Sequence, residues 1–268
     1  MRTIAVTNQK GGSGKTTSAV NLAATLGEKG RRVLVVDLDP QASASAWLGV
    51  KDGGKGLLEV FIGEARLEDL VVPTSAEGVD LVPSSAWLAN AEKALAGEPG
   101  AETILRRAVA RLGNRWDFVL IDCPPALGLL TVSALTAADE VLVPLEASAM
   151  ALAGLAGLTR TVELVADRLN PGLSITAVLA CRVDGRTNLS KDVVDSLRAS
   201  LGEKVLKTVV RENVRLREAW SFGQPITVYD SRSAGAEDYR AAAAELLRRE
   251  PPAVTVTTTR TKSSGSKA

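Results

Sequence analysis

Apolar residues recur along the chain with two different spacings. Short runs that are apolar at nearly every position predict buried strands, and longer stretches with apolar residues three or four positions apart predict helices. The predicted strands are residues 3–8, 33–36, 79–83, 116–122, 140–145, 173–181 and 204–210. The predicted helices are residues 15–28, 56–62, 84–96, 101–112, 150–169, 189–201, 213–222 and 234–249.

Strands that alternate with helices predict an α/β fold, a mostly parallel sheet with helices on both faces. We find no linker and no internal repeat before the paired prolines Pro251 and Pro252, so residues 1–250 are expected to form a single domain. The remaining stretch is rich in Thr, Ser and Lys and has no helical periodicity. Residues 251–268 are therefore expected to be a disordered polar and basic tail.

Composition narrows the classes of protein that fit. Apolar residues make up 46% of the chain but aromatic residues only 3%, which predicts a large core of Ala, Val and Leu. The net charge is +1, so any affinity for nucleic acid needs a local patch. The chain contains no His, and Cys123 and Cys181 are expected to be buried, reduced thiols. With no signal peptide and no apolar run of membrane-spanning length, we expect a soluble, intracellular protein.

A glycine-rich segment, residues 8–17 (NQKGGSGKTT), joins the first predicted strand to the first predicted helix. Small residues let successive backbone N–H groups converge on phosphate oxygens, and the start of a helix adds positive potential. In such a cradle Lys15 would reach the β- and γ-phosphates, and the Thr16 hydroxyl would bind Mg²⁺. Glycine-rich turns with a lysine also occur without a nucleotide, but the strand before, the helix after and the full spacing favour a phosphate site.

This segment departs from the general Walker A pattern, because Gln9 stands where the first glycine would fall and a second lysine, Lys10, follows it. The form K-G-G-x-G-K-T resembles the deviant Walker A motif of the ParA/MinD/Soj group of P-loop ATPases, and especially the short chromosomal ParA (Soj) partition proteins. The resemblance covers residues 2–249. In that family the signature lysine reaches across a dimer interface to the partner's nucleotide, a role that the resemblance assigns to Lys10. It implies nucleotide contacts from Lys10, Gly11, Gly12, Ser13, Gly14, Lys15, Thr16 and Thr17.

Two further segments follow predicted strands and carry acidic residues. Residues 37–41 (DLDPQ) resemble the family's switch I, in which Asp39 would orient the attacking water. On its own, such a run is usually an Asp-Pro turn that caps the next helix. The strand at residues 116–122 ends in Asp122, the Walker B pattern, and we expect this carboxylate to hold Mg²⁺. The Asp-x-Pro-Pro sequence that starts at Asp122 resembles the family's switch II.

The resemblance implies an ATPase that attacks the γ-phosphate with water and uses Lys10, Lys15 and Asp39 as catalytic residues. Turnover is expected to be slow until a partner completes the site. The chain has no N-K-x-D motif that would read guanine. We expect the base between residues 182–184 and 211–213, with Asn213 retained from the family's I-P-R-N pattern and Arg211 in place of its proline.

Family members bind non-specific DNA as ATP-bound homodimers, and the matching arginines here are Arg186 and Arg215. Read alone, both are ordinary solvated charges. The expected helpers are Lys204, Lys207, Arg211 and Arg217. A ParB-type centromere-binding protein is the implied partner, and the implied location is the nucleoid in the cytoplasm. Trp220 replaces a family proline and is expected to be packed or partly exposed.

Other classes of P-loop protein fit this sequence less well. A MinD-like regulator shares the ATP site but ends in an amphipathic membrane helix, which the polar tail beyond Pro252 does not resemble, so no membrane partner is expected. A nitrogenase-type iron protein would need paired cluster cysteines. A P-loop fold that has lost hydrolysis would not be expected to keep Lys15, Thr16, Asp39 and Asp122. Because the P-loop begins by Gln9, a DNA-reading domain before it and specific operator binding are not expected.

The predicted helix at residues 150–169 has a surface of small residues that permits close packing. This surface can serve either the core, which we favour, or a dimer contact. The small residues are Ala151, Ala153, Gly154, Ala156 and Gly157.

Overall fold

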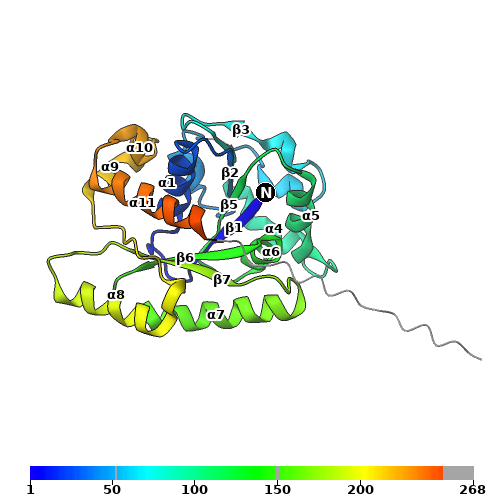
Figure 1. Ribbon diagram of the computed structural model, residues 1–268. Helices are drawn as coiled ribbons and strands as arrows, with labels where there is room; N and C mark the ends of the chain where they lie inside the picture. The colour runs from blue at the N-terminus through cyan, green and yellow to red at the C-terminus, as the bar shows by residue number, and fades with distance from the viewer. Residues whose placement is uncertain (52, 149–150, 250–268) are drawn as a thin grey trace, which may run out of the picture.

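The computed structural model describes residues 1–51, 53–148 and 151–249. Its seven-stranded sheet has the order β3-β4-β2-β5-β1-β6-β7, and every neighbouring pair is parallel except β3 with β4 (Figure 1). The α/β fold with a mostly parallel sheet is therefore confirmed. The strands are β1 (Arg2–Val6), β2 (Val33–Asp37), β3 (Val72–Pro73), β4 (Val79–Val82), β5 (Phe118–Asp122), β6 (Glu140–Glu146) and β7 (Ile175–Cys181).

Helices cover both faces of the sheet, and Figure 1 shows α1 and α11 on one side and α7 on the other. The α-helices are α1 (Lys15–Gly27), α2 (Ser43–Trp47), α3 (Leu57–Phe61), α4 (Ala91–Ala94), α5 (Ile104–Arg111), α6 (Leu129–Ala137), α7 (Ala151–Arg168), α8 (Asn188–Leu201), α9 (Val214–Ser221), α10 (Ile226–Tyr229) and α11 (Ala234–Arg248). The 3₁₀ helices are η1 (Leu67–Leu70), η2 (Ala86–Asn90), η3 (Ala101–Thr103) and η4 (Gly202–Lys204).

The core has two main layers because successive residues of a strand point to opposite faces. In β1, Ala5 packs in the layer that includes α5, α6 and α7, whereas Ile4 and Val6 pack in the layer that includes α1 and α11. Both cysteines are buried and free, as the sequence predicted. No helix of the described residues is long and apolar enough to cross a membrane.

The predicted strand at residues 204–210 is wrong as a continuous strand. Single bridges join Val205 to Val178 and Arg211 to Val183, and the N–H groups of Leu206 and Val210 donate to β7, but the ladder is interrupted between these two residues. There the backbone N–H groups of Lys207 and Thr208 donate to the Glu245 carboxylate of α11, at 2.9 and 3.1 Å, so they cannot donate to β7. A buried carboxylate on a distant helix thus interrupts the sheet's edge.

The helices differ from the prediction in several regions, and the short helices α2 and α10 were not predicted. Residues 84–96 form η2 followed by the short α4, so one continuous helix there was wrong. Helix α6 was not predicted, because it is apolar on nearly all sides and therefore has no amphipathic stripe. In α7, Ala156 and Gly157 are exposed, so core packing was the wrong choice for these two small residues. The predicted tail, residues 251–268, lies outside the described residues.

Candidate nucleotide site

The glycine-rich loop joins β1 to α1 at the carboxyl edge of the sheet. Gly12 and Gly14 adopt φ angles of 71° and 95°, a left-handed conformation that side chains with a Cβ rarely adopt. Asn8 anchors the start of the loop, since its Nδ2 donates to the Pro144 carbonyl at 2.8 Å and its Oδ1 accepts the Lys10 N–H at 3.1 Å. The result is a tight turn that opens onto the N-terminus of α1, the geometry of a phosphate cradle.

Lys15, the first residue of α1, lies almost buried between the loop and the acidic residues of the site. Its Nζ donates to the Lys10 carbonyl at 3.4 Å. Burial lowers the pKa of Lys15, while the charges of Asp122 and Asp39 act in the opposite direction. The predicted lysine and both predicted carboxylates are therefore brought into one electrostatic cluster.

Asp122 ends β5, in register with Val6 of β1 on one side and Asp37 of β2 on the other. Its side chain is fully buried, and neither carboxylate oxygen has a hydrogen-bond partner. Burial and the charge of Asp37 raise the pKa of Asp122 well above its usual range. The nearby Thr16 hydroxyl lowers the pKa of Asp122, although its position does not meet the geometry of a full hydrogen bond.

An unpartnered buried carboxylate costs stability unless a cation or a donor reaches it. The Ser13 hydroxyl in the loop is likewise buried without a partner. Among the described residues no cluster of three Cys, Asp or Glu side chains forms a metal cage. This donor set fits Mg²⁺, which commonly takes one or two protein oxygens and completes its shell with phosphate and water.

Switch I begins at Asp37, whose Oδ2 accepts both the backbone N–H and the hydroxyl of Ser45 at 2.7 Å. Burial raises the pKa of Asp37 to about 6. Asp39 follows, partly exposed, and its Oδ1 accepts the Gln41 N–H at 3.0 Å. The Ala42 N–H donates to the Asp39 carbonyl at 2.8 Å and leads into α2. The Asp-Pro turn before a helix, which the sequence also suggested, is therefore present. It leaves the Asp39 carboxylate at the edge of the site.

The Lys10 side chain forms an ion pair within its own chain. Its Nζ lies 2.5 Å from Glu146 Oε2, at the end of β6, and 3.3 Å from the Ser148 hydroxyl. Arg182 approaches the same carboxylate, with Nη1 3.3 Å from Glu146 Oε1. The Lys10 side chain is 47% exposed, so the pair is open to water and to competing anions.

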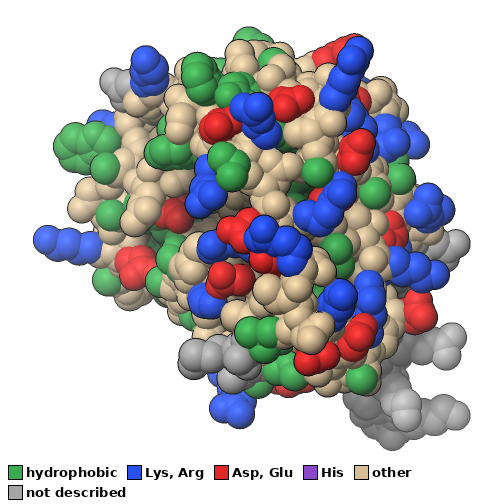
Figure 2. Space-filling view, turned by 90° about the vertical axis from the view of Figure 1, so that its left-hand side faces the viewer, with side chains coloured by type: hydrophobic (Ala, Val, Ile, Leu, Met, Phe, Trp, Pro, Cys, Tyr) green, Lys and Arg blue, Asp and Glu red, His purple; other side chains and the backbone are tan. Residues whose placement is uncertain are grey.

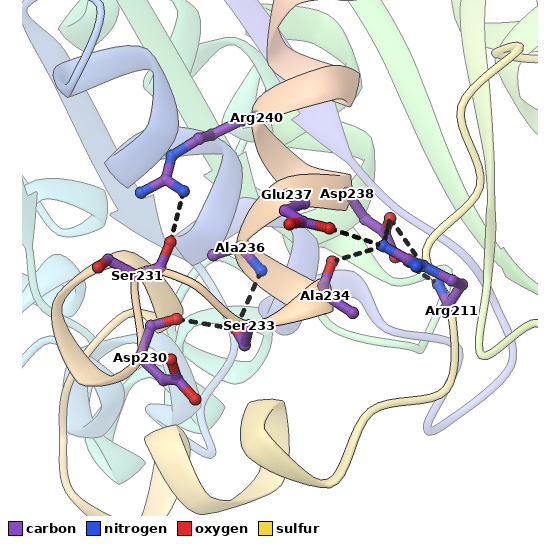
Figure 3. A network of polar contacts seen from close by, with 9 residues as sticks. All are labelled: Arg211, Asp230, Ser231, Ser233, Ala234, Ala236, Glu237, Asp238 and Arg240. Atoms are coloured by element: carbon purple, nitrogen blue, oxygen red, sulfur yellow. Dashed lines mark hydrogen bonds and ion pairs between the residues drawn. The ribbon is translucent and has the colours of Figure 1, made fainter.

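The expected base-binding segments lie side by side, joined by the bridge between Val183 and Arg211. Asn213 uses its Oδ1 to cap α9 by accepting the Arg215 N–H at 2.8 Å, so its amide nitrogen is the group left for a base. Arg211 binds the Asp238 carboxylate, with its Nη2 2.7 Å from Oδ1, and also contacts Glu237 (Figure 3). The arginine that replaces the family's proline therefore ties this segment to the first turn of α11.

Arg186 and Arg215 each follow one of these two segments by two residues, and each is paired with an acid of its own chain. Arg186 is 89% exposed and binds Asp184 through two nitrogens at 2.9 Å. Arg215 lies 2.7 Å from Glu218 and 3.6 Å from Asp230. From the side of α9 and α10, cationic and acidic side chains are interspersed (Figure 2). Trp220 of α9 is half exposed, and Phe222, directly after α9, is 67% exposed.

Sequence reasoning missed three residues of this site: Glu146, which pairs with Lys10; Ser45, which anchors switch I; and Asp37, whose carboxylate faces Asp122. Position at the carboxyl end of a strand was the available signal for Asp37 and Glu146. Nothing in the local pattern singled out Ser45, because its role depends on the fold of α2 back onto Asp37.

Comparisons with known proteins agree with this geometry. A family model described as an AAA domain matches residues 1–175. The chromosome partitioning protein ParA of Myxococcus xanthus is 43% identical over 253 residues, which cover 94% of this chain and 89% of that protein. The chromosome-partitioning ATPase Soj of Thermus thermophilus is 47% identical over 249 residues, covering 93% of this chain and 96% of that protein.

Solved structures give the same fold. A Mycobacterium smegmatis protein described as cobyrinic acid a,c-diamide synthase, with bound ADP and magnesium, has a TM-score of 0.82 and 37% identity, covering 94% of this chain and 98% of that chain. The cell division ATPase MinD of Pyrococcus furiosus has a TM-score of 0.75 and 30% identity, covering 92% and 98%. From these matches and the site, the chain belongs to the ParA/Soj family of chromosome-partitioning P-loop ATPases.

Proposed function

We propose that this chain is an ATP-dependent DNA partition ATPase. Its ATP-bound homodimer binds non-specific DNA and is released when a ParB-type partner stimulates hydrolysis. The observation that carries the proposal is the convergence of Lys15, Asp39 and the unpartnered Asp122 carboxylate at the end of one sheet. The identity to ParA and Soj proteins over most of the chain supports the partition role.

In the proposed site each residue has one task. Gly11, Gly12 and Gly14 present backbone N–H groups to phosphate oxygens, with Ser13 and Thr17 at the same turn. Thr16 and Asp122 hold Mg²⁺, which offsets negative charge on the phosphates. Lys15 binds the β- and γ-phosphates, and Asp39 orients the attacking water. Asn213 contacts the base.

Lys10 is proposed to leave Glu146 and bind the nucleotide of the partner subunit. The triphosphate carries more negative charge than the Glu146 carboxylate, so it favours the exchange. Because a lysine from each chain would be used on the other chain's nucleotide, dimer formation becomes linked to ATP. Hydrolysis then weakens the dimer.

Arg186 and Arg215 are proposed to contact DNA phosphates once two chains lie side by side. Both arginines are exposed and their carboxylate partners are partly exposed, and ion pairs that are open to water contribute little, so phosphates can compete for the arginines. Phosphate contacts predict strong salt dependence and little sequence preference. The protein would then reside on the nucleoid, and a ParB-type centromere-binding protein would be its regulator.

A MinD-like positioning ATPase is the second candidate, favoured by the likeness to the Pyrococcus furiosus MinD structure. The two candidates differ in the surface that the ATP-bound form occupies. Flotation with anionic lipid vesicles in the presence of MgATP separates them, since a partition ATPase should stay with DNA and leave the vesicles.

Co-sedimentation with random-sequence DNA tests the proposal. Wild type should sediment with DNA in MgATP and remain in the supernatant in MgADP or without nucleotide. Lys15→Ala should not sediment under any condition, because phosphate binding is lost. Asp39→Ala should sediment and stay bound, because hydrolysis is lost. Equal sedimentation of wild type in ATP and ADP would contradict the proposal.

A further inference from the structure

Helix α2 directly follows switch I and is attached to it at its first turn. The Ser45 backbone N–H and hydroxyl both donate to Asp37 at 2.7 Å, and the Ser45 hydroxyl accepts the Ser84 N–H at 2.9 Å. All three residues are buried or nearly so. Any displacement of switch I therefore carries α2 with it.

The other end of α2 is attached to the turn between α9 and α10. Trp47, the last residue of α2, is 4% exposed, and its indole Nε1 donates to the Gln224 carbonyl at 2.7 Å. The contact is close, because a Cβ on Gly223 would lie 3.4 Å from the Ala46 carbonyl oxygen. Trp47 also packs in the core layer that contains Leu216 and Ala219, the buried side of α9.

The same turn is attached to α1. The Ile226 N–H donates to the Asn21 Oδ1 at 2.7 Å, and this bond is buried. Asn21 lies one helical turn beyond Thr17, since its Nδ2 donates to the Thr17 carbonyl at 2.8 Å. Both helices that leave the phosphate site thus hold the α9–α10 turn, one through Asn21 and the other through Trp47.

The exposed side of α9 carries Arg215 and Arg217. Since α9 is a short helix of eight residues, a shift of the turn at its end changes the position of these arginines directly. The hydrogen bond matters here because Trp47 is buried and a buried indole N–H without its acceptor is costly, and so α2 and the turn are expected to move together.

We propose that Trp47 is a positioning residue that transmits the nucleotide state of switch I to helix α9. Its hydrogen bond to Gln224 makes α2 a rigid link between Asp37 and the α9–α10 turn. The DNA consequence of this link rests on the proposed function, whereas the link itself does not. The indole N–H of Trp47 binds Gln224 and forms no hydrogen bond with the phosphate cradle or with the exposed arginines.

Trp47→Phe removes the N–H donor and keeps an aromatic ring in the core. Trp116→Phe is the matched control, because Trp116 is also buried and its Nε1 donates to Asp80 at 2.8 Å, beside the start of β5 at the opposite edge of the sheet. A loss of stability common to buried tryptophans would appear in both variants, and thermal unfolding of each measures it.

Backbone amide exchange over residues 214–229 is the primary measurement, with a non-hydrolysable ATP analogue and magnesium against MgADP. In wild type and Trp116→Phe, exchange in this segment should differ between the two nucleotides by about 5-fold, the lower range of allosteric coupling. In Trp47→Phe the difference should disappear over 214–229 and persist over the P-loop. A wild-type difference retained in Trp47→Phe, or no difference in wild type, overturns the proposal.

DNA binding gives the second measurement and separates the two claims. The gain in affinity for random-sequence DNA on replacing MgADP with the analogue should fall about 5-fold or more in Trp47→Phe and stay unchanged in Trp116→Phe. If wild type shows the exchange difference but binds no DNA, the DNA role fails and the link stands. If DNA affinity keeps its nucleotide dependence in Trp47→Phe while the exchange difference over 214–229 is lost, the link stands and its proposed effect on DNA binding is wrong.

Discussion

The Lys10 ammonium lies 2.5 Å from the Glu146 carboxylate of the same chain. Arg182 contacts that carboxylate from the other side at 3.3 Å, and the ion pair with Lys10 lowers the pKa of Glu146. In a single chain the signature lysine therefore already has an anionic partner. A nucleotide on a second chain has to compete with it.

Glu146→Gln should favour the ATP-bound dimer. The amide keeps the shape of the side chain but loses the charge that holds Lys10, so the ATP concentration for half-maximal dimer formation should fall about 2- to 5-fold, the scale of an exposed ion pair. Light scattering during an ATP titration measures it. Glu64→Gln, which breaks the exposed pair with Lys55, is the control and should behave as wild type. A higher ATP requirement in Glu146→Gln would mean that Glu146 helps the dimer instead.

Asp122→Asn should separate stability from ligand binding. The substitution removes a fully buried carboxylate that has no hydrogen-bond partner and only the Lys15 charge nearby to offset its own, so the nucleotide-free protein should unfold at the same or a higher temperature. MgATP at 100 times its Kd should stabilise wild type by about 2.7 kcal/mol and the variant by much less. Thermal unfolding with MgATP, and with ATP plus EDTA, measures both effects. A full MgATP shift in the variant would exclude Asp122 as a magnesium ligand.

Replacing Arg186 and Arg215 together by Ala should weaken DNA binding without loss of the dimer. Each arginine that binds a phosphate contributes to the salt dependence, so the slope of log K against log salt should fall by about two per chain. Fluorescence anisotropy with labelled random DNA at several salt concentrations measures this. The matched control replaces Arg107 and Arg111, two exposed arginines of α5, and should leave the slope unchanged. An unchanged slope in the first variant would rule out these phosphate contacts.

Acid should remove a small stabilising contact at the amino edge of the sheet. Asp117 accepts hydrogen bonds from the Arg32 side chain and backbone, which lower its pKa from 3.8 to about 2. Because this folded-state pKa lies below the unfolded value, the contact stabilises the folded protein above pH 4, and the contribution is lost as the pH falls toward 2. Urea unfolding across this range should show a shallower acid loss for Asp117→Asn than for wild type, with Asp192→Asn as the control. Identical profiles would show that the pair does not contribute.

The fold could be predicted from the sequence wherever the residues of a segment alone determine its secondary structure. The P-loop between β1 and α1, and Asp122 at the end of β5, follow from local patterns of apolar residues, glycines and acids. The candidate nucleotide site lies at the shared carboxyl edge because parallel strands bring their ends together. This is why residues as distant in sequence as Lys15 and Asp122 could be assigned to one site.

The structure differs from the prediction where a contact with a residue distant in sequence determines the local conformation. The segment at 204–210 has the composition of a strand, but Glu245 of α11 takes two of its N–H groups. Glu146 and Trp47 acquire their roles only through contacts with Lys10 and Gln224, far away in the chain. Local patterns contain no information about such pairs.

The molecular mass of Asp39→Ala in saturating MgATP tests the proposed dimer most directly. Multi-angle light scattering should give 28.0 kDa without nucleotide and twice that mass with MgATP, and Lys10→Ala in the same background should return the protein to the monomer. A protein that stays at 28.0 kDa with MgATP, or a dimer that survives loss of Lys10, would contradict the proposed exchange of Lys10 between chains.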